Sequence, residues 1–283
     1  MKVNRKNRPL IIVTTIYCIC LLFRALEYFV LRTDQTVLGE AFVHKLLGIA
    51  ILFACMKLYH FKPSEIGFVC TKAICDLLKG LAFGIGVFLI AYTTEILILV
   101  IQGNFESLGF YVSAYAVDGN VGNQTAFVFF VICFIGNIIN VVMEEGVFRG
   151  LFQKILAKKY SFLVAAVIAS AIFGFWHIMS PLRSYCDGVM GLGGFAANSV
   201  MLVVTSGLVG FKFALMTKLT GNLYMAMGDH FLNNTIVNVL HVISDAGADQ
   251  MQVVRIAVAQ SVSFAIVLAW YLMKKRRSDS NGI

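Results

Sequence analysis

The sequence predicts an all-α fold, a polytopic transmembrane helical bundle of about eight helices, and three observations support this fold class. First, 59% of the 283 residues are hydrophobic and only 13% are charged, whereas a soluble domain carries about 25% charged residues. Second, apolar runs recur along the chain at lengths near the roughly 20 residues that a helix needs to span a bilayer. Third, the alternating polar and apolar pattern of a membrane β-barrel is absent. We therefore expect a single transmembrane domain over residues 1–283.

Eight segments are expected to be helical, because a helix pairs all its backbone polar groups within one segment. The first follows a basic N-terminus and lacks a small-residue cleavage site, so we interpret it as a retained helix and not as a signal peptide. In chain order the segments are Pro9–Leu31, Ala41–Tyr59, Gly80–Ile101, Ala126–Ala157, Phe162–Met179, Gly193–Thr217, Gly221–Ile243 and Met251–Met273.

Charge between the segments predicts their orientation. An excess of lysine and arginine marks the cytoplasmic side, and alternate connections here are basic, so both termini are expected to be cytoplasmic in a multi-pass protein of the cell membrane. The net charge of +8 then serves orientation and contact with the lipid bilayer, and it requires no nucleic acid partner. The basic residues are Lys2, Arg5, Lys6, Arg8, Lys57, Lys62, Lys72, Lys79, Lys154, Lys158, Lys159, Lys212, Lys218, Lys274, Lys275, Arg276 and Arg277.

Several other residues are interpreted as packing features. Arg24 and Glu27 lie three residues apart and are expected to pair on one helix face. Glu95 is expected to contact a neighbouring helix, and His241 to lie at the surface. Small residues in the sixth segment are expected to let it approach its neighbours closely; they are Gly193, Gly194, Ala196, Ala197, Ser199, Gly207 and Gly210.

The first of three motifs is Glu144-Glu145-x-x-x-Arg149, inside the fourth segment. Ionisable residues at membrane depth usually face the bundle interior and have a function. Adjacent residues on a helix point about 100° apart, so Glu144 and Glu145 cannot face the same spot. Arg149 lies four residues after Glu145 and shares its face. We therefore expect Glu145 and Arg149 to form an ion pair, and Glu144 to face a cavity.

The second and third motifs have the same spacing. Phe173 and His177 share one face of the fifth segment, and His230 and Asn234 share one face of the seventh. Asp229 precedes His230 but is expected to point elsewhere. If the three helices converge, a carboxylate, two imidazoles and an amide surround one cavity.

Such a set suits the hydrolysis of an amide. A glutamate can take a proton from water and return it to the leaving amine, and a histidine beside it can orient that water. A second histidine and an asparagine can donate hydrogen bonds to the developing oxyanion, each worth about 10²–10³ in rate. Together, the motifs predict a peptidase that acts within the membrane.

Other interpretations remain open. Each motif alone could be a structural ion pair, a core histidine or a polar bridge between helices. The chain could then be a non-proteolytic membrane scaffold or regulator, or a proton-coupled transporter, since intramembrane glutamates and histidines carry protons. However, the two related halves that transporters often show are absent.

We expect the site to need no cofactor. The sequence lacks the His-Glu-x-x-His zinc signature. Zinc is nevertheless possible, because Glu144, His177 and His230 are residue types that bind it.

The three motifs, in this order, resemble the pattern of the CPBP family of intramembrane proteases, also called the Abi family. That family includes CAAX prenyl endopeptidases and bacteriocin-processing enzymes, and the resemblance also leaves a bacteriocin-immunity protein as an alternative. The resemblance covers a protease core at about residues 126–243 and implies an endopeptidase whose substrate is a peptide or protein in or at the membrane. It implies glutamate-dependent chemistry, with a metalloprotease as the alternative. By this resemblance, Glu144 and His177 activate water, His230 and Asn234 stabilise the oxyanion, and Glu145, Arg149 and Phe173 support the site.

Overall fold

The computed structural model describes residues 8–36, 39–113 and 122–280. Each of the eight predicted segments contains a long helix, and six helical stretches in the described ranges are long and apolar enough to cross a membrane. The predicted helical membrane fold is therefore confirmed. The long helices are α1 (Arg8–Leu26), α2 (Val43–Leu58), α3 (Ala73–Gln102), α4 (Phe127–Glu144), α6 (Phe162–Trp176), α8 (Leu192–Thr220), α9 (Tyr224–Val239) and α10 (Gln252–Ser280).

Shorter helical turns join or extend these helices. Two are π-helices, which hold one extra residue per turn and often occur at functional sites. One of them, η6, interrupts the fourth predicted segment at Glu145, so that segment is not one continuous α-helix. The short elements are η2 (Glu27–Leu31), η3 (Thr33–Gln35), η4 (Pro63–Ile66), η5 (Cys70–Lys72), η6 (Glu145–Phe152), α5 (Gln153–Leu156) and α7 (Met179–Cys186).

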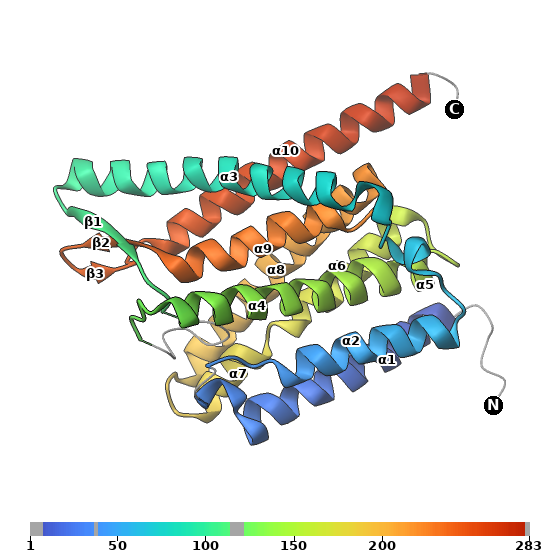
Figure 1. Cartoon of the computed structure of the whole chain (residues 1–283), viewed down its shortest axis with the longest axis horizontal. Helices are drawn as coiled ribbons and strands as arrows, with labels where there is room; N and C mark the ends of the chain where they lie inside the picture. Colours follow the sequence, from blue (N-terminus) through green and yellow to red (C-terminus); the bar gives the residue numbers. More distant parts are fainter. Residues whose placement is uncertain (1–7, 37–38, 114–121, 281–283) are drawn as a thin grey trace.

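A small antiparallel sheet, which the sequence analysis did not predict, lies at one end of the bundle (Figure 1). Its strands are β1 (Phe105–Phe110), β2 (Leu240–Ser244) and β3 (Gly247–Ala248), in the order β1-β2-β3.

The sheet corrects the expectation that His241 lies at the surface. Its side chain stacks on Tyr111 at 4.1 Å between ring centroids, and its Nδ1 lies 2.5 Å from Asp249. His241 is 1% exposed, because strand pairing carries the end of the seventh segment back over the bundle. Burial by itself raises the pKa of Asp249, but hydrogen bonds from His241 and Arg255 outweigh it and hold that pKa below the ordinary 3.8.

The opposite end of the bundle is basic. The first helix begins there, and α10 ends there (Figure 1). We call it the basic end, because η4, α5 and the end of α8 carry or adjoin Lys62, Lys154, Lys158, Lys159 and Lys218. Lys2, Arg5 and Lys6 lie outside the described residues, and the cytoplasmic placement of the termini stays a prediction.

Close backbone contacts set the depth of α9 against α3. A Cβ atom added at Gly80 would lie 2.1 Å from the carbonyl oxygen of Met225, and one at Gly228 would lie 2.4 Å from that of Leu77. Only glycine permits this approach at either position. The crossing therefore fixes the position of α9 along α3, and α9 is the helix that carries the third motif.

The helices α6 and α8 also meet closely. A Cβ atom at Gly174 would lie 2.3 Å from the carbonyl oxygen of Val203, and one at Gly210 would lie 3.0 Å from the ring of Phe173. The prediction that small residues bring α8 close to a neighbour is confirmed at Gly210. It is wrong for Gly193, where an added Cβ would meet nothing within 4 Å.

Buried ion pairs join α8 to α9 and α3 to α10. Lys212 lies 2.7 Å from Asp229, and Arg255 lies 3.0 Å from Glu95. As predicted, Asp229 points away from the third motif, and Glu95 contacts a neighbouring helix. Lys212 was expected to be one of the bases that mark the cytoplasmic side. That expectation was wrong, since Lys212 is 2% exposed and pairs with a carboxylate within the bundle.

Candidate active site

The π-helix η6 begins with a buried ion pair. Oε1 of Glu145 lies 3.3 Å from Nη1 of Arg149, and both side chains are almost fully buried. Nε of Arg149 donates a hydrogen bond to the carbonyl oxygen of Gly210 at 3.3 Å, and its guanidinium carbon lies 3.9 Å from the centroid of the Phe173 ring. The predicted pairing of Glu145 with Arg149 is confirmed, and the Phe173 ring, on α6, contacts the Arg149 guanidinium.

Glu144 faces a different environment from its neighbour. It is the last residue of α4 and lines a pocket of about 240 Å³. The indole Nε1 of Trp176 donates a hydrogen bond to its Oε1 at 3.0 Å, while its Oε2 lies 3.6 Å from Nε2 of His230. The carboxylate is therefore oriented by α6 and α9 together.

His230 lies between the two carboxylates. Its Nδ1 lies 2.8 Å from Oε1 of Glu145, and a carboxylate only accepts, so Nδ1 carries a hydrogen. The ring of Phe213 stacks on the imidazole, with centroids 4.9 Å apart. Packing and hydrogen bonding thus aim Nε2 of His230 at the side of the pocket where Glu144 lies.

His177 and Asn234 line the same pocket. Nδ1 of His177 lies 2.9 Å from the carbonyl oxygen of Phe173, so Nδ1 donates and a neutral imidazole keeps a lone pair on Nε2. Oδ1 of Asn234 accepts a hydrogen bond from Asn233 at 3.1 Å, which leaves the Asn234 amide N–H groups as donors. His177 therefore offers an acceptor at Nε2, and Asn234 offers a donor at its amide nitrogen.

The pocket wall also contains polar residues that the sequence analysis assigned elsewhere or missed. Arg24 is 6% exposed; its Nη2 donates to the hydroxyl of Tyr28 at 3.2 Å, and its guanidinium lies 4.5 Å from the Trp176 ring centroid. Its Nε and Nη1 have no hydrogen-bond partner among the described residues. The other lining residues are His44, Lys45, Asn137, Asn140, Val237 and Asn238.

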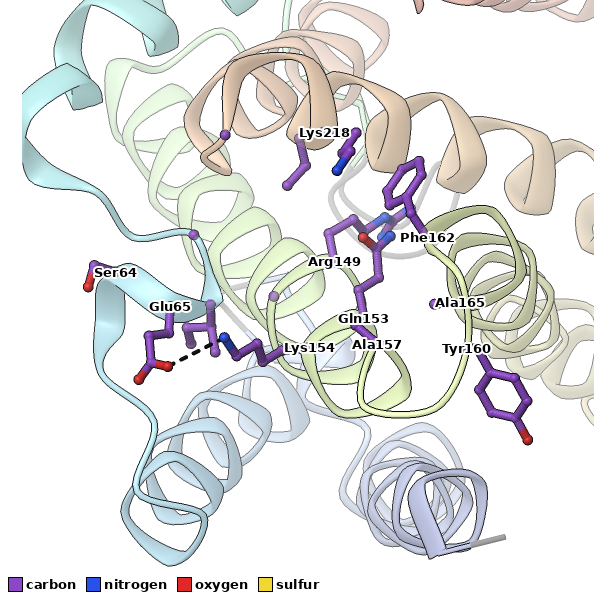
Figure 2. A pocket seen from close by; sticks show the side chains of 15 residues that line it. Ser64, Glu65, Arg149, Gln153, Lys154, Ala157, Tyr160, Phe162, Ala165 and Lys218 are labelled. Carbon is purple, nitrogen blue, oxygen red and sulfur yellow. Dashed lines mark ion pairs between the residues drawn. The ribbon is translucent and has the colours of Figure 1, made fainter. Parts of the chain in front are cut away.

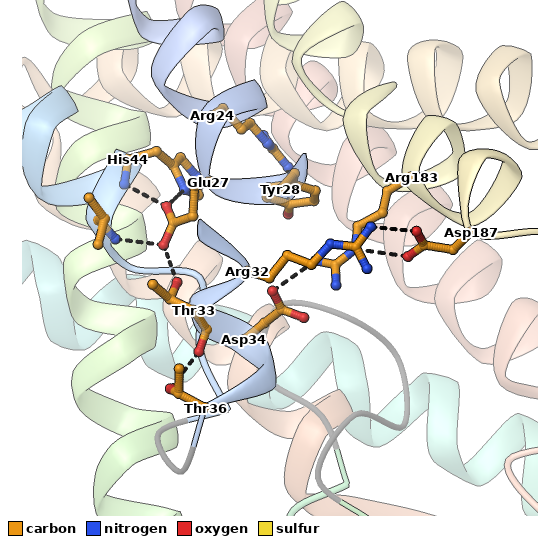
Figure 3. A network of polar contacts seen from close by, with 11 residues as sticks. Arg24, Glu27, Tyr28, Arg32, Thr33, Asp34, Thr36, His44, Arg183 and Asp187 are labelled. Atoms are coloured by element: carbon orange, nitrogen blue, oxygen red, sulfur yellow. Dashed lines mark hydrogen bonds and ion pairs between the residues drawn. The ribbon is translucent and has the colours of Figure 1, made fainter. Parts of the chain in front are cut away.

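The expected pairing of Arg24 with Glu27 is wrong. Glu27 instead accepts hydrogen bonds from the side chains of His44 and Thr33 and from the backbone N–H groups of Val43 and His44 (Figure 3). The π-helix η2 starts at Glu27 and turns it towards the start of α2, away from the face of α1 that Arg24 occupies.

An ion-pair network ties α7 to the turn after α1, beside this wall (Figure 3). Arg183 contacts Asp34 at 2.7 Å and Asp187 at 3.4 Å, and Arg32 contacts Asp187 at 2.6 Å. The hydrogen bond from Arg32 holds the pKa of Asp187 below its ordinary value. Arg183 also lies 5.9 Å from the ring centroid of Tyr28, so the network supports the pocket wall.

A sequence signal for the missed residues existed. Arg24, His44 and Lys45 are ionisable residues within apolar runs, which is unusual unless they face the bundle interior. Asn137 and Asn140 precede Glu144 by about two turns and one turn respectively, and they share its face. Sequence alone did not show that α1 and α2 reach the same pocket as the motifs.

The described residues include no group of three or more His, Cys, Asp or Glu side chains arranged to hold a metal ion. Glu144, His177 and His230 share the pocket, and Nδ1 of each histidine is engaged, with Phe173 and Glu145 respectively, so that only Nε2 of each ring could coordinate a metal.

Comparison with known proteins finds a match to one family model over part of the chain. Residues 125–236 match the family model described as type II CAAX prenyl endopeptidase, Rce1-like. No curated protein matches the chain. The matched range contains Glu144, His177, His230 and Asn234, which line the pocket.

Proposed function

Because the chain carries a domain of the Rce1-like family of CAAX prenyl endopeptidases, we propose that it is an intramembrane endopeptidase that cleaves a membrane-associated protein or peptide. One observation carries the proposal beyond the family match. The side chains of Glu144, His177, His230 and Asn234, which come from three separate helical segments, line one pocket. A packing role for each motif does not require that convergence.

Glu144 acts as the general base in this proposal. It takes a proton from a water molecule held by the lone pair of His177 Nε2, and the water oxygen attacks the scissile carbonyl carbon. The carbon–nitrogen bond then breaks, and Glu144 returns the proton to the leaving amine. The hydrogen bond from Trp176 at 3.0 Å keeps the carboxylate in one orientation through both transfers.

His230 and Asn234 stabilise the tetrahedral intermediate. Nδ1 of His230 donates to Glu145, so Nε2 faces the pocket, and the role assigned to it here, donation to the oxyanion, requires a hydrogen on Nε2. The free N–H groups of Asn234 supply the second donor. Loss of one such donor costs about 10²–10³ in rate. The Glu145–Arg149 pair holds His230 in place and does not contact the substrate.

The test is peptide cleavage by purified protein. Wild type and Glu144→Gln are incubated with a fluorogenic peptide library, with and without a chelator, and with and without a prenyl group on the peptides. Glu106→Gln is the matched control, because Glu106 lies on strand β1, away from the pocket. We expect cleavage by wild type and Glu106→Gln but not by Glu144→Gln, unaffected by the chelator.

Full turnover by Glu144→Gln would falsify the general-base role. Loss of wild-type cleavage on chelation would replace it with a metal-dependent reaction. The prenyl comparison then shows whether the substrate must carry a lipid.

A further inference from the structure

A second and larger pocket opens at the basic end. Its volume is about 470 Å³, and among the described residues it shares none with the catalytic pocket. Four parts of the chain form it: the turn η4, the junction of η6 and α5, the start of α6, and the end of α8 (Figure 2). The peptidase chemistry proposed above does not use this pocket.

The pocket contains buried hydrogen-bond donors without partners. Nη2 of Arg149, Nε2 of Gln153 and Oγ1 of Thr217 have no hydrogen-bond partner within the described part of the chain. Arg149 is 3% exposed, so bulk water does not satisfy it. Buried donors left unpaired are strongly unfavourable, and three around one cavity indicate a ligand rich in acceptor oxygens.

The charge of the pocket is positive. Arg149, Lys154 and Lys218 line it together with one acidic residue, Glu65. Glu65 is engaged at the rim, where its Oε1 lies 3.4 Å from Nζ of Lys154. Lys218 lies 5.3 Å from the ring centroid of Phe162 and makes no ion pair with a described residue. The side chains of Arg149, Gln153 and Lys218 extend towards one another in the pocket (Figure 2).

The position of the pocket restricts the source of such a ligand. It lies where α8 ends and α6 begins, which is headgroup depth for helices that cross a membrane. Tyr160 lines it, and tyrosine, with its amphipathic ring, favours that depth. Basic pockets between helices at this level bind the headgroups of anionic lipids.

We propose that the basic-end pocket binds a phosphate group, supplied by the headgroup of an anionic phospholipid or by free phosphate. Phosphate presents several acceptor oxygens and negative charge to Arg149 Nη2, Gln153 Nε2, Thr217 Oγ1 and Lys218. Arg149 keeps its ion pair with Glu145 through Nη1 and donates from Nη2 to the phosphate.

The test measures binding directly, so it does not depend on peptidase activity. Delipidated protein is titrated with phosphatidylglycerol, with the matching diacylglycerol, which lacks phosphate, and with inorganic phosphate. Native mass spectrometry counts bound lipid, and thermal unfolding reports stabilisation by all three. The variant Lys218→Gln/Gln153→Leu removes two donors, and Lys275→Gln is the control, a lysine on the exposed tail of α10.

We expect wild type and Lys275→Gln to bind phosphatidylglycerol but not diacylglycerol, and the double variant to bind it about tenfold more weakly. If the double variant does not fold, Thr217→Val, which keeps the side-chain volume, is used and is expected to weaken binding in the same direction. Stabilisation by inorganic phosphate that competes with the lipid identifies free phosphate as a source.

Three results would overturn the proposal. One is equal binding of phosphatidylglycerol by wild type and the donor variants. Another is equal binding of diacylglycerol and phosphatidylglycerol, because phosphate then has no role. The third is no binding of either phosphate source.

Discussion

The buried pair of Glu145 and Arg149 allows a quantitative prediction about stability. The change is Arg149→Met, which keeps the length of the side chain but removes its charge. Both partners are almost fully buried, so the variant strands the carboxylate of Glu145 inside the bundle. Breaking a buried ion pair from one side costs about 3–5 kcal/mol.

That cost is a large part of the total. Folded proteins are stable by about 5–15 kcal/mol, and in larger domains 1 kcal/mol shifts the melting temperature by about 2–4 °C. We therefore expect Arg149→Met to melt about 10 °C below wild type and to accumulate at lower yield. Contact with the Phe173 ring at 3.9 Å is lost in the same change, which acts in the same direction.

The assay is thermal unfolding of the detergent-solubilised protein, followed by size-exclusion chromatography of the remaining folded fraction. The double variant Arg149→Met/Glu145→Gln should recover part of the loss, because it leaves no stranded charge. Arg32→Met is the control; it breaks an exposed pair with Asp187, which solvent screens. The reasoning is refuted if Arg149→Met melts like wild type, or if the double variant is no more stable than the single one.

Three further predictions follow from other contacts. Gly174→Ala should lower stability by about 1–3 kcal/mol, since its Cβ would overlap the Val203 carbonyl, while Gly193→Ala should not; thermal unfolding of both variants checks this. Asp249→Asn should lower the stability by about 1.5–3 kcal/mol at neutral pH. Because the folded pKa of Asp249 is lowered, the stability that its carboxylate contributes is complete above the ordinary 3.8 and disappears as pH falls through the lowered pKa. Equal stability differences from wild type at pH 7 and pH 3 would contradict this prediction. Asn234→Ala should reduce kcat about 10²–10³-fold with an unchanged melting temperature, and unreduced turnover would remove Asn234 from the oxyanion site.

Part of the structure follows from local sequence properties. Segment hydrophobicity and length depend on consecutive residues only, so all eight helical segments were predicted in their places along the chain, although α3 begins at Ala73 and not Gly80, and α10 ends at Ser280 and not Met273. The Glu145–Arg149 pair is also local, because residues four apart on a helix are neighbours, and it forms even though η6 is a π-helix.

Predictions that ignored contacts between distant segments failed. Arg24 and Glu27 have suitable spacing for a pair, but Glu27 contacts α2 instead. Lys212 and His241 lie near predicted helix ends, yet inside the protein Lys212 pairs with Asp229 and His241 contacts Asp249. In each case the preferred partner lies on another element.

By itself, the sequence determined that this chain forms a helical membrane protein, and it identified three ordered motifs whose residue types suit hydrolysis, because hydropathy, helical spacing and residue type are local. Only the tertiary structure decided which polar groups share a pocket. It brought Arg24 and His44 to the wall beside Glu144, placed His230 between two carboxylates, and left Arg149 facing a second pocket at the basic end. The physical reason is that burial and hydrogen bonding depend on how distant helices cross, which no single segment encodes.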